Sequence, residues 1–152
     1  IGFNYRMSDI QAAVGREQLK RLPEIVKLRR NLALRYHKLL GQIPGLGVPR
    51  EPEWAHSNWQ SYCIRLPEGL NQQQLMQSML DQNVATRRGI MCIHREPAYK
   101  KESWRPQEAG ALRDSERAQE ECILLPLYPQ MTESEQDRVV EVLTLACEGV
   151  RS

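Results

Sequence analysis

Residues 2–13 read Gly-Phe-Asn-Tyr-Arg-Met-Ser-Asp-Ile-Gln-Ala-Ala, which places a polar and aromatic motif directly before the start of a helix. Ser8 and Gln11 have the spacing of a capping box, in which each side chain hydrogen-bonds the other residue's backbone N–H. The apolar residues that follow, Ile10, Ala13 and Val14, recur at helical spacing. The sequence therefore predicts a first helix from about Ser8 to about Arg21.

A second, longer helix is predicted to follow at once. Pro23 suits a first helical position, and Gly41 is a typical helix end. One apolar stripe connects them, made of Ile25, Leu28, Leu32, Tyr36 and Leu39. Because no residues are left between the two helices to reverse the chain, we expect them to lie end to end with a bend near Pro23.

The remaining residues alternate short strands with helices after a loop over 41–57 that is rich in Gly and Pro. Strands are predicted at 59–66 and 122–126, residues 83–88 are predicted to form a turn and a short strand, and a further short strand is predicted at 47–49. Helices are predicted to begin at Asn71, at Asp114 or Ser115, and at Thr132. This order predicts a small α+β domain with a sheet of about three strands covered on one side. We expect an N-terminal interface segment with linking helices at 1–43 and the small domain at 44–152.

Composition excludes several classes of function. The 152 residues have a net charge of +2, which gives no indication of nucleic-acid binding, and no apolar run is long enough for a membrane span. The four cysteines, Cys63, Cys92, Cys122 and Cys147, form no metal-ligand pair. We interpret them as reduced, mostly buried thiols and expect a cytoplasmic protein without a bound metal.

Two stretches are candidates for binding. At the first, Asn4 and Arg6 would add donors beside the free N–H groups of a helix N-terminus, an arrangement that favours an anion. At the second, His94 and Tyr99 flank a proline turn, after the basic run at 86–89. The alternatives are a well-capped N-terminal tail and a polar loop with solvated arginines. The sequence contains no self-contained active site, so we assign no catalytic residue.

The motif at 2–13 resembles the signature of the DegT/DnrJ/StrS sugar aminotransferases, which are fold-type-I pyridoxal-phosphate enzymes. Further matches follow in the same order at 18–22, 29–30, Tyr36, 58–59, 86–87, 94–99 and 125–132. The resemblance implies the small C-terminal domain of such an enzyme, preceded by a long bent helix. It also implies a homodimer that uses pyridoxal phosphate to transfer an amino group, with glutamate as the expected donor, to a keto sugar nucleotide.

The same resemblance implies that the Schiff-base lysine belongs to a domain that precedes this segment. None of the five lysines, Lys20, Lys27, Lys38, Lys100 and Lys101, matches its position. The chain opens at Ile1, inside the motif, so we expect a segment of a longer protein. This segment alone is expected to be inactive and to hold no cofactor. The alternative is a catalytically silent interaction or regulatory module that retains the aminotransferase small-domain fold.

The resemblance also assigns individual residues. Asn4 corresponds to the asparagine that reaches across the dimer interface to the cofactor phosphate in the partner subunit. Tyr5 and Arg6 would lie close to the same phosphate or to the sugar nucleotide. His94 and Tyr99 fall in a loop that borders the sugar pocket, so both are predicted to contact substrate.

Overall fold

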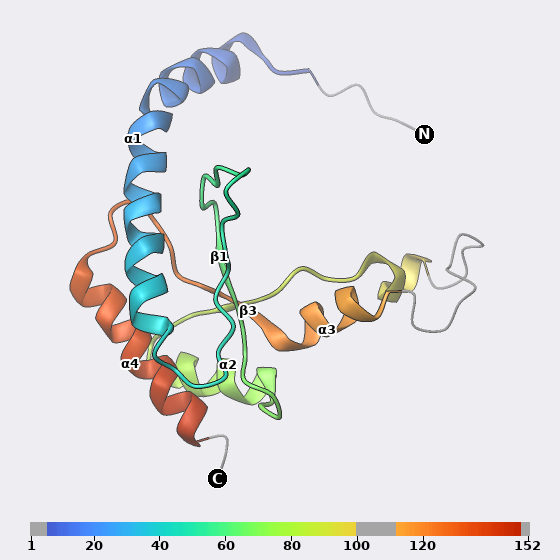
Figure 1. Ribbon diagram of the computed structural model, residues 1–152. Helices are drawn as coiled ribbons and strands as arrows, with labels where there is room; N and C mark the ends of the chain where they lie inside the picture. Colours follow the sequence, from blue (N-terminus) through green and yellow to red (C-terminus); the bar gives the residue numbers. More distant parts are fainter. Residues whose placement is uncertain (1–5, 100–111, 150–152) are drawn as a thin grey trace.

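A single long helix opens the fold. The computed structural model describes residues 6–99 and 112–149, and α1 runs over Asp9–Leu40 (Figure 1). Both hydrogen bonds of the predicted capping box are present at Ser8, the N-cap. The two predicted helices are in fact one, with Pro23 inside it. Proline removes one backbone hydrogen bond, and the turns on either side continue the helix at an angle, so that its first part tilts away from the rest (Figure 1).

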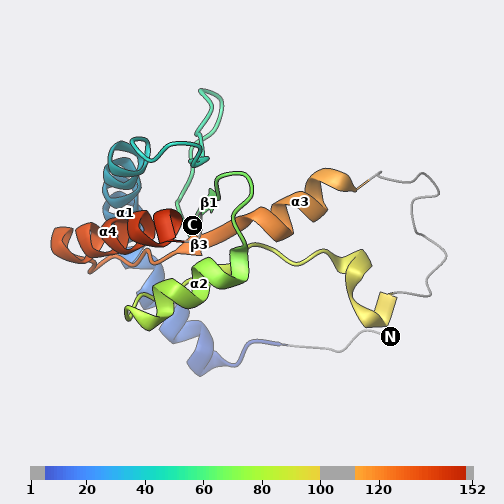
Figure 2. The ribbon, with the colours of Figure 1, turned by 90° about the horizontal axis from the view of Figure 1, so that it is seen from below.

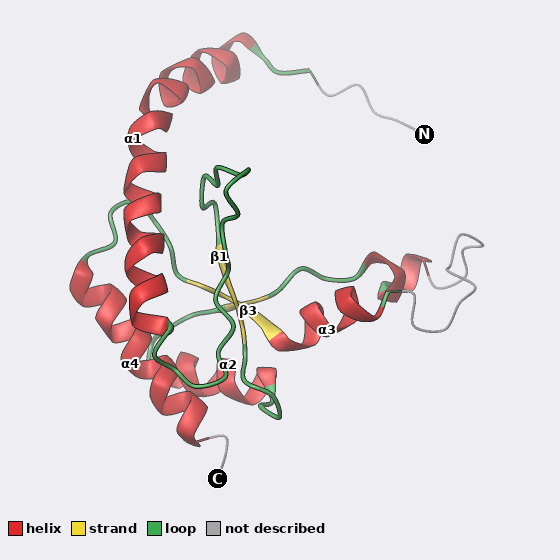
Figure 3. Ribbon diagram, in the orientation of Figure 1, coloured by secondary structure: helices red, strands yellow, loops and turns green. Residues whose placement is uncertain are grey.

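The strands, drawn in yellow in Figure 3, form one antiparallel sheet in the order β1-β3-β2. They are β1 (Tyr62–Arg65), β2 (Arg87–Arg88) and β3 (Cys122–Leu125). In the β1–β3 register, Tyr62 pairs with Leu125 and Arg65 pairs with Cys122. Gly47 forms an isolated bridge to Arg65, at the short strand that was predicted over 47–49.

Strand β1 is shorter than the predicted strand over 59–66. Trp59 has a φ of 49°, in the left-handed region, which bends the chain before the sheet begins. The Ser57 hydroxyl accepts from the Trp59 N–H at 3.1 Å, and the Asn58 side chain accepts from the Gln60 N–H at 3.1 Å. These local side-chain bonds satisfy the backbone in place of a sheet ladder.

Three further helices complete the fold: α2 (Gln72–Asp81), α3 (Arg113–Glu121) and α4 (Glu133–Gly149). Asn71 caps α2, and Thr132 and Glu135 form the predicted capping box of α4. The predicted start of α3 at Asp114 or Ser115 was wrong, because the helix begins at Arg113. The carboxylate of Asp114 lies in the first turn instead, where it complements the positive end of the helix.

One face of the sheet is buried against α1, α2 and α4. The sheet contributes the side chains of Tyr62, Ile64, Ile123 and Leu125, all at most 4% exposed. Fully buried side chains from the helices meet them: Tyr36, Leu40, Leu75, Met79, Val142 and Leu143. The Tyr36 and Tyr62 rings lie 5.2 Å apart, and the Tyr36 hydroxyl donates to the Pro126 carbonyl at 2.9 Å. The predicted one-sided cover of the sheet is therefore confirmed.

A side arm projects away from this core. It consists of residues 89–99, which include the short 3-10 helices η1 (Ile93–Arg95) and η2 (Pro97–Tyr99), together with α3. In two perpendicular views the arm extends to the side opposite α1 and α4 (Figures 1 and 2). Residues 89–99 carry exposed apolar side chains, including Ile90 and Ile93.

Candidate functional site

The first predicted site lies at the start of α1. Asn4 and Tyr5 fall outside the described residues, whereas Arg6 is described and exposed. The Gln11 N–H donates to the Ser8 hydroxyl at 3.3 Å, and the Ser8 N–H donates to the Gln11 side chain at 2.9 Å. Arg6 lies two residues before this N-cap, so its positive charge adds to that of the helix N-terminus.

The charges at this helix start partly oppose each other. Asp9 is the acidic residue of the first turn, so its carboxylate offsets part of the field that would attract an anion. Arg6 supplies a guanidinium whose planar fork of donors suits a phosphate. Anion binding here would therefore depend on the side chains of the motif rather than on the helix dipole alone.

Lysines among the described residues are poorly placed to form a Schiff base. Lys20, Lys27 and Lys38 are all exposed on α1, and the Lys20 ammonium is paired with Glu17 at 2.7 Å. Lys100 and Lys101 lie outside the described residues. A Schiff-base lysine needs a desolvated site that lowers its pKa, and an exposed helix surface does not provide one.

The second predicted site lies on the side arm. His94 belongs to η1, and its side chain is 16% exposed. Its Nε2 lies 2.8 Å from Oε1 of Glu116, which belongs to α3. His94 also lines a pocket of about 440 Å³ whose other walls are mostly apolar: Ile90, Met91, Cys92, Ile93, Leu112, Ser115 and Ala118. Tyr99 lies at the end of η2 and is 44% exposed. The two residues thus lie on neighbouring turns.

A cluster of charges holds η1 against α3. Arg95 lies 3.3 Å from Glu116 and 2.6 Å from Glu120. The hydrogen bonds from His94, and then from Arg95, lower the pKa of the Glu116 carboxyl below its usual value. Glu116 is therefore ionised at neutral pH. No pattern in the sequence points to Glu116, because a glutamate on a short charged helix normally indicates a solvated face.

The basic run at 86–89 does not join this cluster through any contact that the described residues show. Arg87 and Arg88 form β2, and both side chains are exposed. The Thr86 hydroxyl is buried and has no hydrogen-bond partner among the described residues. Arg87 and Arg88 therefore form an exposed edge of the sheet.

The loop before β1 is tied to α1 by an ion pair. The Arg30 guanidinium donates to both carboxylate oxygens of Glu51, at 2.8 and 2.9 Å, and to the Ser57 carbonyl at 2.6 Å. The hydrogen bond from Arg30 and that from the Ser57 N–H lower the pKa of Glu51 to about 2. Trp59 follows this loop, and its ring stacks on that of Tyr62 with the ring centroids 5.6 Å apart. The loop is therefore held in one conformation beside α1.

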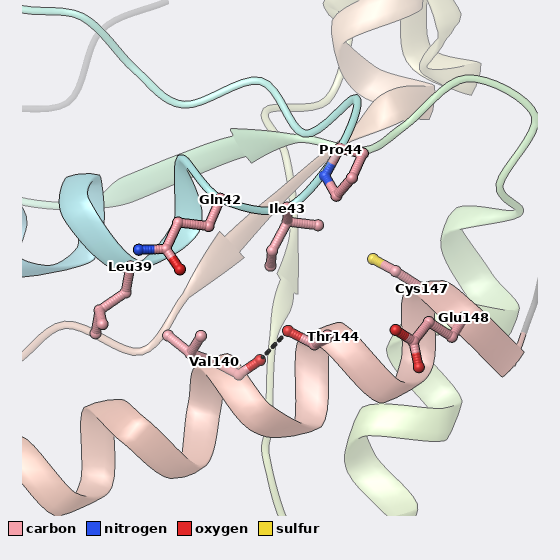
Figure 4. A pocket seen from close by; sticks show the side chains of 8 residues that line it. All are labelled: Leu39, Gln42, Ile43, Pro44, Val140, Thr144, Cys147 and Glu148. Atoms are coloured by element: carbon pink, nitrogen blue, oxygen red, sulfur yellow. Dashed lines mark hydrogen bonds between the residues drawn. The ribbon is translucent and has the colours of Figure 1, made fainter.

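Another pocket lies between the end of α1 and α4 (Figure 4). Its volume is about 410 Å³, and its lining residues are Leu39, Gln42, Ile43, Pro44, Val140, Thr144, Cys147 and Glu148. The Thr144 hydroxyl donates to the Val140 carbonyl at 2.8 Å, so that group is already used within the helix. None of the predicted site residues lines this pocket, and we assign it no role.

The described residues contain no group of three or more His, Cys, Asp or Glu side chains that could hold a metal ion. Within the same ranges, no helix is both long enough and apolar enough to cross a membrane. Cys92 and Cys147 are buried, and Cys63 and Cys122 are half-buried.

Comparison with known proteins defines the class of the chain. The model of the DegT/DnrJ/EryC1/StrS aminotransferase family matches residues 1–144. The chain belongs to this family. The expected fold class, the small α+β domain of a fold-type-I aminotransferase, is also confirmed.

Individual relatives agree with this assignment. The spore coat polysaccharide biosynthesis protein SpsC of Bacillus subtilis (strain 168) is 31% identical over 146 residues, covering 93% of this chain and 37% of SpsC. The aminotransferase TlmJ from Streptoalloteichus hindustanus is 28% identical with a TM-score of 0.82, over 96% of this chain and 38% of TlmJ. DesV from S. venezuelae is 26% identical with a TM-score of 0.84, over 97% of this chain and 38% of DesV. The chain thus spans well under half the length of these relatives.

Proposed function

We propose that this chain is the C-terminal part of an aminotransferase that uses pyridoxal phosphate to transfer an amino group, from glutamate as donor, to a keto sugar nucleotide. The observation that carries the proposal is the family match over residues 1–144. The names of two relatives support it: SpsC is a polysaccharide biosynthesis protein and TlmJ is an aminotransferase. We further propose a cytoplasmic homodimer, with an interface segment at 1–43 and the small domain at 44–152.

The donors at the start of α1 fit the phosphate of the cofactor. Arg6 is exposed beside the helix N-terminus, and a guanidinium is a strong donor to phosphate. We assign Asn4 to the phosphate bound in the partner subunit, with Tyr5 and Arg6 beside it. When bound, pyridoxal phosphate supplies the aldehyde and the electron-accepting ring that amino transfer needs. The residues of this chain would bind and orient it, and they would supply no catalytic lysine.

His94 and Tyr99 are assigned to the sugar. His94 lines the pocket of the side arm, and Tyr99 lies half-exposed on the next turn. An imidazole and a phenol offer the donors and acceptors that recognise sugar hydroxyls, while the apolar pocket wall would pack against carbon atoms of the substrate.

The proposal is tested on the full-length protein that carries this chain. We expect it to bind pyridoxal phosphate, with an absorbance band near the edge of the visible range, and to transfer the amino group of glutamate to a keto sugar nucleotide. Asn4→Ala should weaken cofactor retention, whereas Asn31→Ala, an exposed position on α1, should leave it unchanged. A full-length protein that binds no cofactor through a lysine would overturn the enzyme proposal and favour a silent interaction module.

This chain by itself should show neither activity nor stable cofactor binding, because the described lysines are exposed on α1. Equilibrium dialysis with pyridoxal phosphate measures this directly. Specific, stoichiometric retention of the cofactor by the isolated chain would contradict the division of roles proposed here.

A further inference from the structure

Side chains of α3 hydrogen-bond the segment that carries His94. Glu116, Gln119 and Glu120 are spaced by three and four residues, so they share one face of the helix. Each contacts a different residue of the facing segment: Glu116 meets His94 at 2.8 Å, the Gln119 side chain accepts from the Cys92 N–H at 2.6 Å, and Glu120 accepts from Arg95 at 2.6 Å. One helix face therefore fixes both the backbone and the side chains around His94.

The C-terminal end of α3 is itself anchored to the domain. Gln72, at the start of α2, is only 8% exposed, and its amide donates to the carbonyls of Gln119 at 3.0 Å and Cys122 at 2.6 Å. The Gly89 N–H donates to the same Cys122 carbonyl at 2.9 Å. A Cβ at Gly89 would lie only 3.2 Å from the Ala118 carbonyl, so the two parts of the side arm approach closely. The C-terminal end of α3 is therefore held in place relative to α2 and to the segment that carries His94.

We propose that Glu116 is a positioning residue for His94, which it orients toward the sugar. The inference rests on the proposed function, which places His94 beside the substrate. An ionised carboxylate only accepts hydrogen bonds, so the 2.8 Å contact places a proton on His94 Nε2. That bond holds the imidazole in one rotamer, with a proton on the nitrogen that faces Glu116, before substrate arrives, and this reduces the ordering cost of binding.

Arg95 supports this role by keeping the Glu116 carboxylate charged and in place. Its guanidinium lies 3.3 Å from the second oxygen of Glu116, so each carboxylate oxygen has its own partner. A carboxylate held on both oxygens has little freedom to rotate away from the imidazole. The orientation of His94 is thus determined by α3, through a residue that need not touch the substrate.

Steady-state kinetics of the full-length enzyme test the proposal. We expect Glu116→Ala to raise KM for the sugar nucleotide by about tenfold, the size of one lost hydrogen bond to a charged group, with a smaller change in kcat. Glu116→Gln, which keeps an acceptor oxygen, should recover most of the affinity. Glu121→Gln is the matched control, because Glu121 lies on the same helix and pairs with Arg117 instead. It should behave as the wild type.

A double-mutant cycle separates positioning from general stabilisation. If Glu116 acts through His94, the pair His94→Ala and Glu116→Ala should raise KM no more than His94→Ala alone. Additive effects, or an unchanged KM in Glu116→Ala, would overturn the proposal. Thermal unfolding of each variant is measured in parallel, since a purely structural role would lower the melting temperature without producing this non-additivity.

Nuclear magnetic resonance of histidine-labelled full-length protein gives a readout that is independent of activity. The imidazole ¹⁵N shifts of His94 should report a proton on Nε2 in the wild type. In Glu116→Ala they should report a mixture of the Nδ1–H and Nε2–H tautomers. Identical spectra would contradict the positioning role. If the wild-type protein transfers no amino group, the proposed function fails, and these spectra still decide whether Glu116 orients the ring.

Discussion

At the residue scale, the Arg30–Glu51 pair makes a prediction about acid stability. The pKa of Glu51 is lowered from 4.5 to about 2, chiefly by the hydrogen bond from Arg30. Because the folded-state value is the lower one, the pair stabilises the fold fully above about pH 4.5, and this contribution is lost as the pH falls toward 2. The urea midpoint of unfolding should therefore decrease less between pH 5 and pH 3 in Glu51→Gln than in the wild type. Glu53→Gln, on the same loop, should retain the wild-type slope.

A second prediction at this scale concerns Cys63. Burial, and then the neighbouring Cys122 thiol, raise the pKa of Cys63 to about 11. Since only the thiolate reacts, alkylation of Cys63 by iodoacetamide at pH 8 should be roughly a hundredfold slower than that of a free thiol, and the rate should rise with pH. Peptide mass mapping over a time course measures it. Rapid modification of Cys63 in the folded protein at pH 8 would show that the thiol is accessible and ionised.

At the scale of elements, the two capping boxes have different consequences. Thr132 caps α4, which contributes Val142 and Leu143 to the core, so Thr132→Ala should lower the free energy of unfolding by about 1 kcal/mol. Ser8 caps the first part of α1, where the side chains are largely exposed. Ser8→Ala should therefore reduce helical circular dichroism while leaving the urea midpoint almost unchanged. Equal losses of midpoint in the two variants would show that the first part of α1 is packed as tightly as α4.

At the scale of the whole molecule, the exposed face of α1 predicts self-association. Five apolar side chains, one just before the helix and four in its first part, are between 47% and 78% exposed: Met7, Ile10, Val14, Leu19 and Leu22. Such a surface lowers its free energy by burial against another chain. Sedimentation velocity of this chain should show concentration-dependent association, which Ile10→Glu with Val14→Glu should weaken. A strictly monomeric profile at high concentration would contradict this expectation, and Arg16→Glu serves as a charge control on the same exposed stretch of α1.

Most helices and strands could be predicted from the amino-acid sequence alone. Capping boxes at Ser8 and Thr132, the alternation that buries Tyr62 and Ile64, and proline after Leu125 all act over a few residues, so each could be read locally. Errors arose where two local signals competed. Pro23 indicated the start of a new helix, yet α1 continues through it.

The contacts that support the side arm could not be predicted from the sequence. His94 and Glu116 are 22 positions apart, and Arg30 and Glu51 are 21 apart, so no local pattern indicates that either pair meets. Their contacts depend on how α3 and the loop before β1 pack after the core has formed. The motif at 2–13 was readable from the sequence because its chemistry is contiguous. The orientation of His94 was not, because a charged helix surface looks the same in the sequence whether it faces water or a partner.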